Sequence, residues 1–290
     1  MKLSELKNKR PQLYSFDESF SAIEKAIANA RDRLKVIEPP SEVLWTYNYY
    51  PYNYSNPWDQ ACYVMRYLYA YAYEYFIAFS SILEKINSNS DLHVMSLGCG
   101  VMPDAWALQE ASKRMELRGM IEYTGVDVFK WPDEYVPETT ERVRKRFIKS
   151  KAGDYLLSCT DIEHDIIIFP KSLGDMYKND RSDLYNVKKA LGEIPLKDEF
   201  YMVFSFIDNE QDNRKDQIEM DYLLDCIRNR GYSGIPKKNK EVNVGICNSY
   251  PPFPRLSDEL VEDSISLAKK HFMTSRIHEN YYICRFTKVK

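Results

Sequence analysis

The sequence predicts an α/β protein with a mostly parallel sheet, because segments of strand type alternate with segments of helix type along the chain. A short apolar run at residues 94–97 ends in Gly98-Cys99-Gly100, and an apolar-periodic segment follows from Pro103. Another apolar run ends at Asp127, and residues 165–169 are apolar after their first residue. Such a run is typical of a central parallel strand that is buried on both of its faces.

The stretch LHVMSLGCGVMPDAWA, residues 92–107, predicts a strand, a tight glycine turn and a helix. Proline suits the first turn of a helix because its missing N–H would have no partner there, so Pro103 indicates the helix start. Glycines let the backbone come close to a ligand, and a helix N-terminus offers unpaired N–H groups to an anion. In an open α/β sheet, a nucleotide-type site begins in this way.

A nicotinamide dinucleotide is disfavoured, because its fingerprint requires a third glycine where this chain has Pro103. The next expected strand, at residues 123–128, carries Asp127 near its end. A carboxylate there can accept hydrogen bonds from both hydroxyls of a ribose. Val128 and Phe129 come directly after it and are placed to lie against an adenine ring.

These residues resemble the class I S-adenosylmethionine-dependent methyltransferases. The matching motifs are LGCG (97–100), Asp104, GVDV (125–128) and DIIIF (165–169), and the resemblance covers roughly residues 92–290. It implies a Rossmann-like, seven-stranded, mostly parallel sheet whose last strand is antiparallel, with helices on both faces and S-adenosyl-L-methionine as cofactor. It leaves the methyl acceptor, a small molecule or RNA, and any catalytic residue unidentified. The cofactor-binding residues that it implies are Leu97, Gly98, Cys99, Gly100, Asp104, Asp127, Val128 and Phe169.

One position departs from the family pattern. Many family members have another glycine two residues after the GxG pair, where this chain has Met102. A methionine side chain there would narrow the cofactor pocket. An alternative hypothesis is therefore a catalytically inactive, methyltransferase-like protein that binds the cofactor or serves in an assembly.

The composition predicts a globular cytoplasmic protein. Hydrophobic residues make up 44% of the 290 residues, which is enough for a sizeable core. A formal net charge of −3 disfavours bulk capture of nucleic acid, although a local basic patch is compatible with it. The scattered cysteines and dispersed histidines predict neither disulfides nor a metal site. We expect no secretory signal and no membrane span, because no apolar run is long enough.

The sequence predicts two parts, a helical and tyrosine-rich N-terminal extension at residues 1–90 and a methyltransferase-like domain at residues 91–290. Apolar residues at helical spacing predict a first helix over residues 17–34. A loop is expected at residues 47–54, followed by a helix from Pro57 to about residue 86 with Asn56 as its cap.

Eleven of the 23 tyrosines lie between Tyr47 and Tyr75, and two interpretations of them are open. They are either core residues of a helix packed on the sheet, or a stacking lid over the acceptor or over nucleobases. Because only a short link joins this helix to the first strand, the helix must lie close to the sheet. We therefore expect the helix to be core and the loop to cover the cofactor-side opening, with Tyr49 and Tyr50 facing the substrate.

The third strand is expected at residues 143–148, with a short crossover helix at residues 152–157, because a parallel crossover needs a dozen or more residues. Arg142, Arg144 and Arg146 share one face of this strand. They form either a phosphate-binding stripe or, as we favour, charges that protect an edge strand.

Beyond the fourth strand, Lys171 and Ser172 are expected to face the methyl acceptor, because ligands of an open α/β sheet lie beyond the carboxyl ends of its strands. Alternatively, they only make a turn and cap a helix that starts near Asp175. Lys171, Asp208 or a tyrosine hydroxyl is available as a base, and the sequence does not choose among them. Further strands are expected at residues 200–207, 242–247 and 281–288, with helices at residues 216–230 and 257–272.

The segment SYPPF, residues 249–253, is similar to the [DNS]PP[YFW] loop of amino-DNA methyltransferases. It departs from that motif because Tyr250 stands where a small polar residue belongs, and because it follows the sixth strand and not the fourth. We interpret it as a proline-stiffened wall of the acceptor pocket, with Tyr250 facing the substrate.

Overall fold

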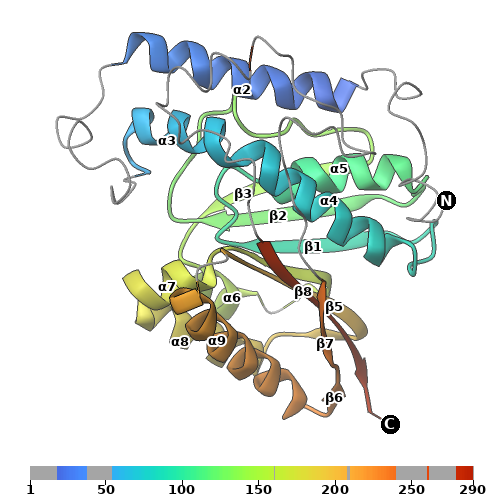
Figure 1. Cartoon of the computed structure of the whole chain (residues 1–290). Coiled ribbons are helices and arrows are strands. Elements are labelled where there is room, and N and C mark those ends of the chain that lie inside the picture. Colours follow the sequence, from blue (N-terminus) through green and yellow to red (C-terminus); the bar gives the residue numbers. More distant parts are fainter. Residues whose placement is uncertain are drawn as a thin grey trace.

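The computed structural model describes residues 18–37, 54–159, 161–207, 210–239, 260 and 279–289. They form an open sheet that is covered by helices on both faces (Figure 1). The strand order is β3-β2-β1-β4-β5-β8-β6, and β7 also pairs with β8. The predicted α/β fold class, with its mostly parallel sheet, is confirmed.

Parallel strands make up most of the sheet, and each had been expected from an apolar run or from its spacing. Because β1 lies between β2 and β4, the crossovers change direction at this point of the sheet. Such a switch point leaves a crevice outside the carboxyl ends of the strands, where ligands bind in folds of this type. The parallel strands are β1 Leu92–Leu97, β2 Ile121–Asp127, β3 Val143–Lys149, β4 His164–Pro170 and β5 Leu196–Ile207.

The last strand, β8 Glu279–Lys288, runs antiparallel to β5, as expected. Two short strands, β6 Tyr232–Ser233 and β7 Pro236–Asn239, pair with its other edge. They were not expected, because the segment contains Gly234, Pro236 and two lysines and has no strand pattern. The sixth strand expected at residues 242–247 lies outside the described residues, as does most of the helix expected at residues 257–272.

The N-terminal helices and α5 cover one face of the sheet (Figure 1). The expected tyrosine-rich helix is present and ends at Leu83, three residues before the expected end, with a π-helical segment that had not been expected. The predicted cap is confirmed, because Asn56 Oδ1 accepts a hydrogen bond from Trp58 N at 2.8 Å. The elements are α2 Glu18–Val36, α3 Pro57–Tyr63, the π-helical segment Val64–Leu68, α4 Tyr69–Leu83 and α5 Pro103–Arg114.

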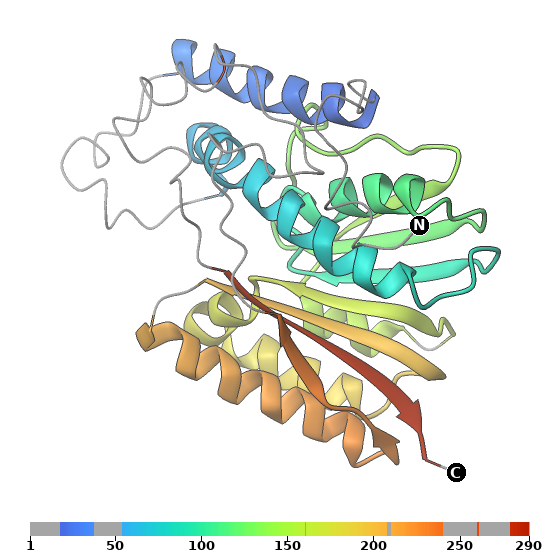
Figure 2. The ribbon, with the colours of Figure 1, turned by 45° about the vertical axis from the view of Figure 1, so that its right-hand side comes forward.

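The remaining described helices cover the opposite face (Figure 2). The short crossover helix after β3 is confirmed as α6. The helix expected near Asp175 begins two residues earlier as α7, and a further helix, α8, was missed. The helix expected from residue 216 begins six residues earlier, as α9. The bounds are α6 Ala152–Ser158, α7 Leu173–Asn179, α8 Arg181–Leu191 and α9 Glu210–Arg228.

The tyrosine-rich helix is part of the main core. Its Tyr69, Tyr71, Tyr73 and Tyr75 are at most 6% exposed and pack in one cluster with residues of β1, β4 and α5. The expectation that this helix is core is therefore confirmed for α4. The apolar core is continuous across residue 90, and the domain boundary there stays a prediction. None of the described helices is long and apolar enough to span a membrane.

Candidate functional site

The glycine turn after β1 lies at the switch point of the sheet. Gly98 and Gly100 both have left-handed backbone conformations, with φ of +75° and +52°. A Cβ atom on Gly98 would lie 2.4 Å from the Ser172 Cβ, so this position needs glycine for packing. A Cβ on Gly100 would meet, among the described residues, only the Tyr63 hydroxyl at 3.9 Å. Within the described part of the chain, Gly100 therefore faces open space beside Tyr63, where a ligand can approach the backbone.

Asp127 closes the turn from the end of β2. Its Oδ2 accepts a hydrogen bond from Gly100 N at 2.8 Å, and its Oδ1 accepts one from Phe129 N at 2.9 Å. Burial raises the pKa of the carboxyl and nearby Asp175 adds to this effect, while the backbone N–H groups oppose it. Each carboxylate oxygen keeps a further acceptor position. Asp127 thus shapes the turn and can still accept hydrogen bonds from a diol.

The other predicted cofactor residues lie around this turn in different ways. Leu97, Cys99 and Phe169 are at most 1% exposed, so their side chains support the turn and the strand ends from within the core. Val128, in contrast, is 45% exposed next to Asp127.

Asp104 lies beneath the turn. Its side chain is fully buried, and Oδ2 accepts a hydrogen bond from the Tyr123 hydroxyl at 3.0 Å. Burial raises the pKa of Asp104 to about 6, while the hydrogen bond from Tyr123 opposes the shift. In the described structure, Asp104 joins the start of α5 to β2.

Met102 is also turned into the core. It has a left-handed backbone, with φ of 58°, and is 1% exposed. Its Cε lies 3.2 Å from the position that a Cβ on Gly125 would take, so the side chain packs against β2. We expected Met102 to narrow the cofactor pocket, which requires its side chain to project into the crevice. The side chain is instead buried against β2.

An aromatic wall rises beside the glycine turn. Tyr63 contacts Tyr67, with ring centroids 5.0 Å apart, and Tyr67 stacks on Tyr71 at 5.1 Å. The π-helical segment lies directly after Tyr63, and such segments are frequent at functional sites. Towards β2, Tyr54 contacts Phe129 at 6.0 Å, close to Asp127. The wall consists of Tyr54, Tyr63, Tyr67, Tyr71, Phe129 and Trp131. The predicted substrate-facing residues Tyr49, Tyr50 and Tyr250 lie outside the described residues.

Lys171 and Ser172 lie directly after β4, as expected, and both side chains are bonded within the protein. Lys171 Nζ donates to Glu74 Oε2 at 3.1 Å, to Ser205 Oγ at 2.9 Å and to Phe206 O at 3.3 Å. Ser172 Oγ donates to Leu97 O at 2.6 Å. Glu74 was not predicted as a site residue from the sequence. The only signal was one carboxylate in an otherwise apolar helix, a residue type that is rarely buried without a partner.

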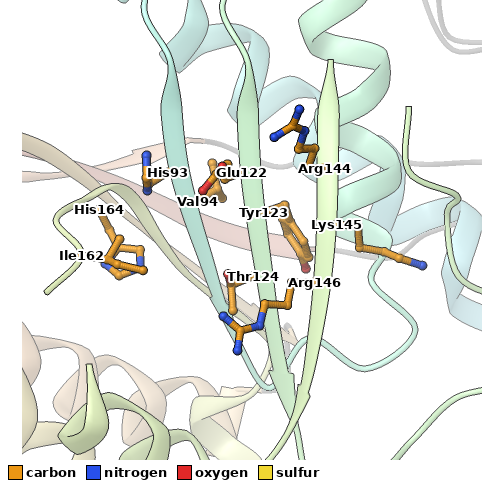
Figure 3. Close-up of a pocket in the computed structure, with 10 residues that line it drawn as sticks. All are labelled: His93, Val94, Glu122, Tyr123, Thr124, Arg144, Lys145, Arg146, Ile162 and His164. Atoms are coloured by element: carbon orange, nitrogen blue, oxygen red, sulfur yellow. The ribbon is translucent and has the colours of Figure 1, made fainter. Parts of the chain in front are cut away.

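A separate cavity of about 220 Å³ lies at the opposite end of the strands (Figure 3). His93, Glu122, Arg144 and His164 line it near the amino ends of β1, β2, β3 and β4. Arg146 also lines this cavity, and it lies on β3, an edge strand of the sheet. An edge strand is where charged side chains that prevent further strand pairing are expected. Among the described residues, no group of His, Cys, Asp and Glu side chains is arranged to hold a metal ion.

Comparisons with known proteins give structural likenesses only. No protein-family model and no curated protein matches the chain. The plantazolicin methyltransferase BpumL, solved with SAH, is 13% identical over 92% of this chain and 96% of its own, with a TM-score of 0.37. A SAM-dependent methyltransferase from Archaeoglobus fulgidus is 14% identical over 76% and 99% of the two chains, with a TM-score of 0.40. A putative RNA methyltransferase from Pyrococcus horikoshii is 15% identical over 91% and 99%, with a TM-score of 0.34. At these values the likenesses do not assign an activity.

Proposed function

We propose that this protein is an S-adenosyl-L-methionine-dependent methyltransferase. The observation that carries the proposal is the hydrogen bond of 2.8 Å between Gly100 N and Asp127, next to the open space at Gly100. It joins a glycine turn to an acidic strand end at the switch point of an open α/β sheet, where nucleotide-type ligands bind.

In this proposal the chain holds the cofactor along the crevice. Asp127 accepts hydrogen bonds from the ribose hydroxyls, Val128 and Phe129 lie against the adenine, and the turn from Gly98 to Gly100 approaches the amino-acid part. The bound cofactor supplies an electrophilic methyl group on a positively charged sulfur. Aromatic faces attract cations, so the aromatic wall suits this charge. Catalysis then comes largely from holding acceptor and methyl group in line.

The acceptor, a small molecule or RNA, would lie against the aromatic wall, the predicted loop with Tyr49 and Tyr50, and the segment with Tyr250. Burial raises the pKa values of Tyr63 and Tyr71 well above the ordinary value of a phenol. Both phenols therefore stay protonated at neutral pH. The half-buried Tyr54, Tyr63 and Tyr67 offer π faces and O–H groups to the acceptor, and buried Tyr71 supports them from the core. Tyr63 and Tyr71 do not supply a base.

Calorimetric titration with S-adenosylmethionine and S-adenosylhomocysteine tests the cofactor assignment. The wild type should bind both, and Gly100→Ala should bind at least about tenfold more weakly, because the added methyl group enters the open space. The matched control is Gly231→Ala after α9, where φ is also left-handed, at +82°, and no described atom lies within 4 Å of the added Cβ. Asp127→Ala should also lose at least about tenfold, since it removes an acceptor of charge-assisted hydrogen bonds.

A wild type that binds neither compound at about 1 mM would refute the cofactor assignment. Transfer of an isotope-labelled methyl group to cell extract separates an enzyme from an inactive cofactor-binding protein. Absence of labelled product with a wild type that binds the cofactor would favour the inactive protein.

A further inference from the structure

Glu74 is a buried carboxylate of the N-terminal extension that reaches the carboxyl ends of two strands of the sheet. It lies on α4 with its side chain fully buried. Its Oε2 accepts a hydrogen bond from Lys171 Nζ at 3.1 Å, directly after β4, and its Oε1 accepts one from the Ser205 hydroxyl on β5. One side chain thus connects the extension to the strands on one side of the switch point.

The described contacts of this cluster connect α4 with the ends of β4 and β5. The Lys171 ammonium has three N–H donors, and they meet Glu74, Ser205 and the Phe206 carbonyl. The Ser205 hydroxyl donates to Glu74 and accepts from Lys171, and the ammonium also lies 4.5 Å from the centre of the Tyr71 ring. Burial raises the pKa of Glu74 and lowers that of Lys171, and each charge opposes the shift of the other.

The network continues to the glycine turn through the next residue. Lys171 has a left-handed backbone, with φ of 57°, and its N–H donates to Phe169 O at 3.0 Å and to Ser205 O at 3.1 Å. This sharp turn places Ser172 against Gly98, and its hydroxyl donates to Leu97 O at 2.6 Å. The Lys171 backbone therefore connects the buried ammonium to Ser172, and Ser172 lies against Gly98.

We propose that Glu74 is a positioning residue of the cofactor site. By fixing Lys171, it holds Ser172 against the glycine turn. The N-terminal extension thereby contributes to the geometry of that site. The inference rests on the proposed function. A carboxylate that served only to stabilise α4 would affect unfolding and leave the geometry of Gly98 and Gly100 unchanged.

Glu110 provides the matched control. It is also a buried carboxylate, 2% exposed, on a helix over the same face of the sheet, and it pairs with Arg114 within that helix. Glu110→Ala removes a buried carboxylate from its cationic partner, as Glu74→Ala does. No described contact of Glu110 leads to the glycine turn.

The test is calorimetric affinity for S-adenosylmethionine together with the amide resonances of glycine-labelled protein. Glu74→Ala should weaken binding at least about tenfold and shift the Gly98 and Gly100 amides, since small misplacements in a site have large effects. Glu74→Gln keeps the length of the side chain and one of its two acceptor oxygens, so it should lose less affinity than Glu74→Ala. Glu110→Ala should stay within about twofold and leave these amides in place.

Ser205→Ala gives an independent result if Glu74→Ala does not fold, because it removes one of the two links between Glu74 and Lys171 and keeps their direct hydrogen bond. It should weaken binding about threefold or more and shift the same amides. Wild-type affinity in Ser205→Ala, or equal losses in Glu74→Ala and Glu110→Ala, would overturn the positioning role. A wild type without affinity for the cofactor would instead refute the proposed function.

Discussion

Replacement of Asp104 by asparagine should stabilise the protein at neutral pH. Burial raises the pKa of this carboxyl from 3.8 to about 6, so the folded state keeps the proton to higher pH than the unfolded state does. Below the pKa of Asp104 in the unfolded state, ionisation costs the folded protein no stability. Above its pKa in the folded state, the full cost is present. It then amounts to about 3 kcal/mol of unfolding free energy. Asparagine carries no charge, and its oxygen can still accept the hydrogen bond from the Tyr123 hydroxyl.

Urea unfolding of wild type and Asp104→Asn at several pH values measures this effect. The stability of the variant relative to wild type should rise by about 2 kcal/mol between pH 4.5 and pH 7.5. Asp133→Asn, an exposed carboxylate in the segment after β2, serves as the control. A difference that does not change with pH would refute the assignment of this cost to Asp104. Loss of S-adenosylmethionine affinity in a stable Asp104→Asn variant would assign Asp104 to the cofactor site, as the family resemblance implies.

Three further predictions concern the buried pair of Glu74 and Lys171, the glycine turn and the predicted tyrosine loop. Lys171→Met should lower the unfolding free energy by about 3–5 kcal/mol, because it leaves the Glu74 carboxylate buried without its cation, and adding Glu74→Leu should restore part of it. Urea unfolding of both variants checks this, and equal stability of single and double variants would contradict it. Gly98→Ala should lower the melting temperature far more than Gly100→Ala in calorimetry, because only its Cβ would lie 2.4 Å from Ser172. Replacing Tyr49, Tyr50 and Tyr52 together with alanine should barely change the melting temperature but should weaken cofactor retention or acceptor use, and a loss of folding with no ligand-specific effect would assign these tyrosines to the core.

Local patterns were enough to predict much of the sheet. The glycine turn and the helix after Pro103 follow from backbone preferences of two residue types, which act wherever those residues occur. The third strand, β3, was placed correctly because a parallel crossover has a minimum length, a constraint that needs no knowledge of packing. α8 was missed, although Asp180, the single residue between it and α7, caps it by accepting a hydrogen bond from Asp183 N.

Such patterns did not predict the direction in which the side chains of the site point. Asp104 and Met102 belong to the motif that predicted the cofactor site, and both are turned into the core. Their orientation depends on β1 and β2, with which they pack, and spacing along the chain does not report it. The π-helical segment after Tyr63 likewise has no composition that distinguishes it from the helix around it.

By itself, the sequence determined the fold class, the glycine turn and the acid at the end of β2, because these depend on local backbone preferences and on chain length between neighbouring elements. Only the tertiary structure showed that Glu74 and Lys171, 97 residues apart, form one buried pair. The physical reason is that such a pair is stable only where packing excludes water from both charges and supplies their remaining hydrogen bonds. This buried environment is formed by α4, β4 and β5 together, and no single one of these segments specifies it.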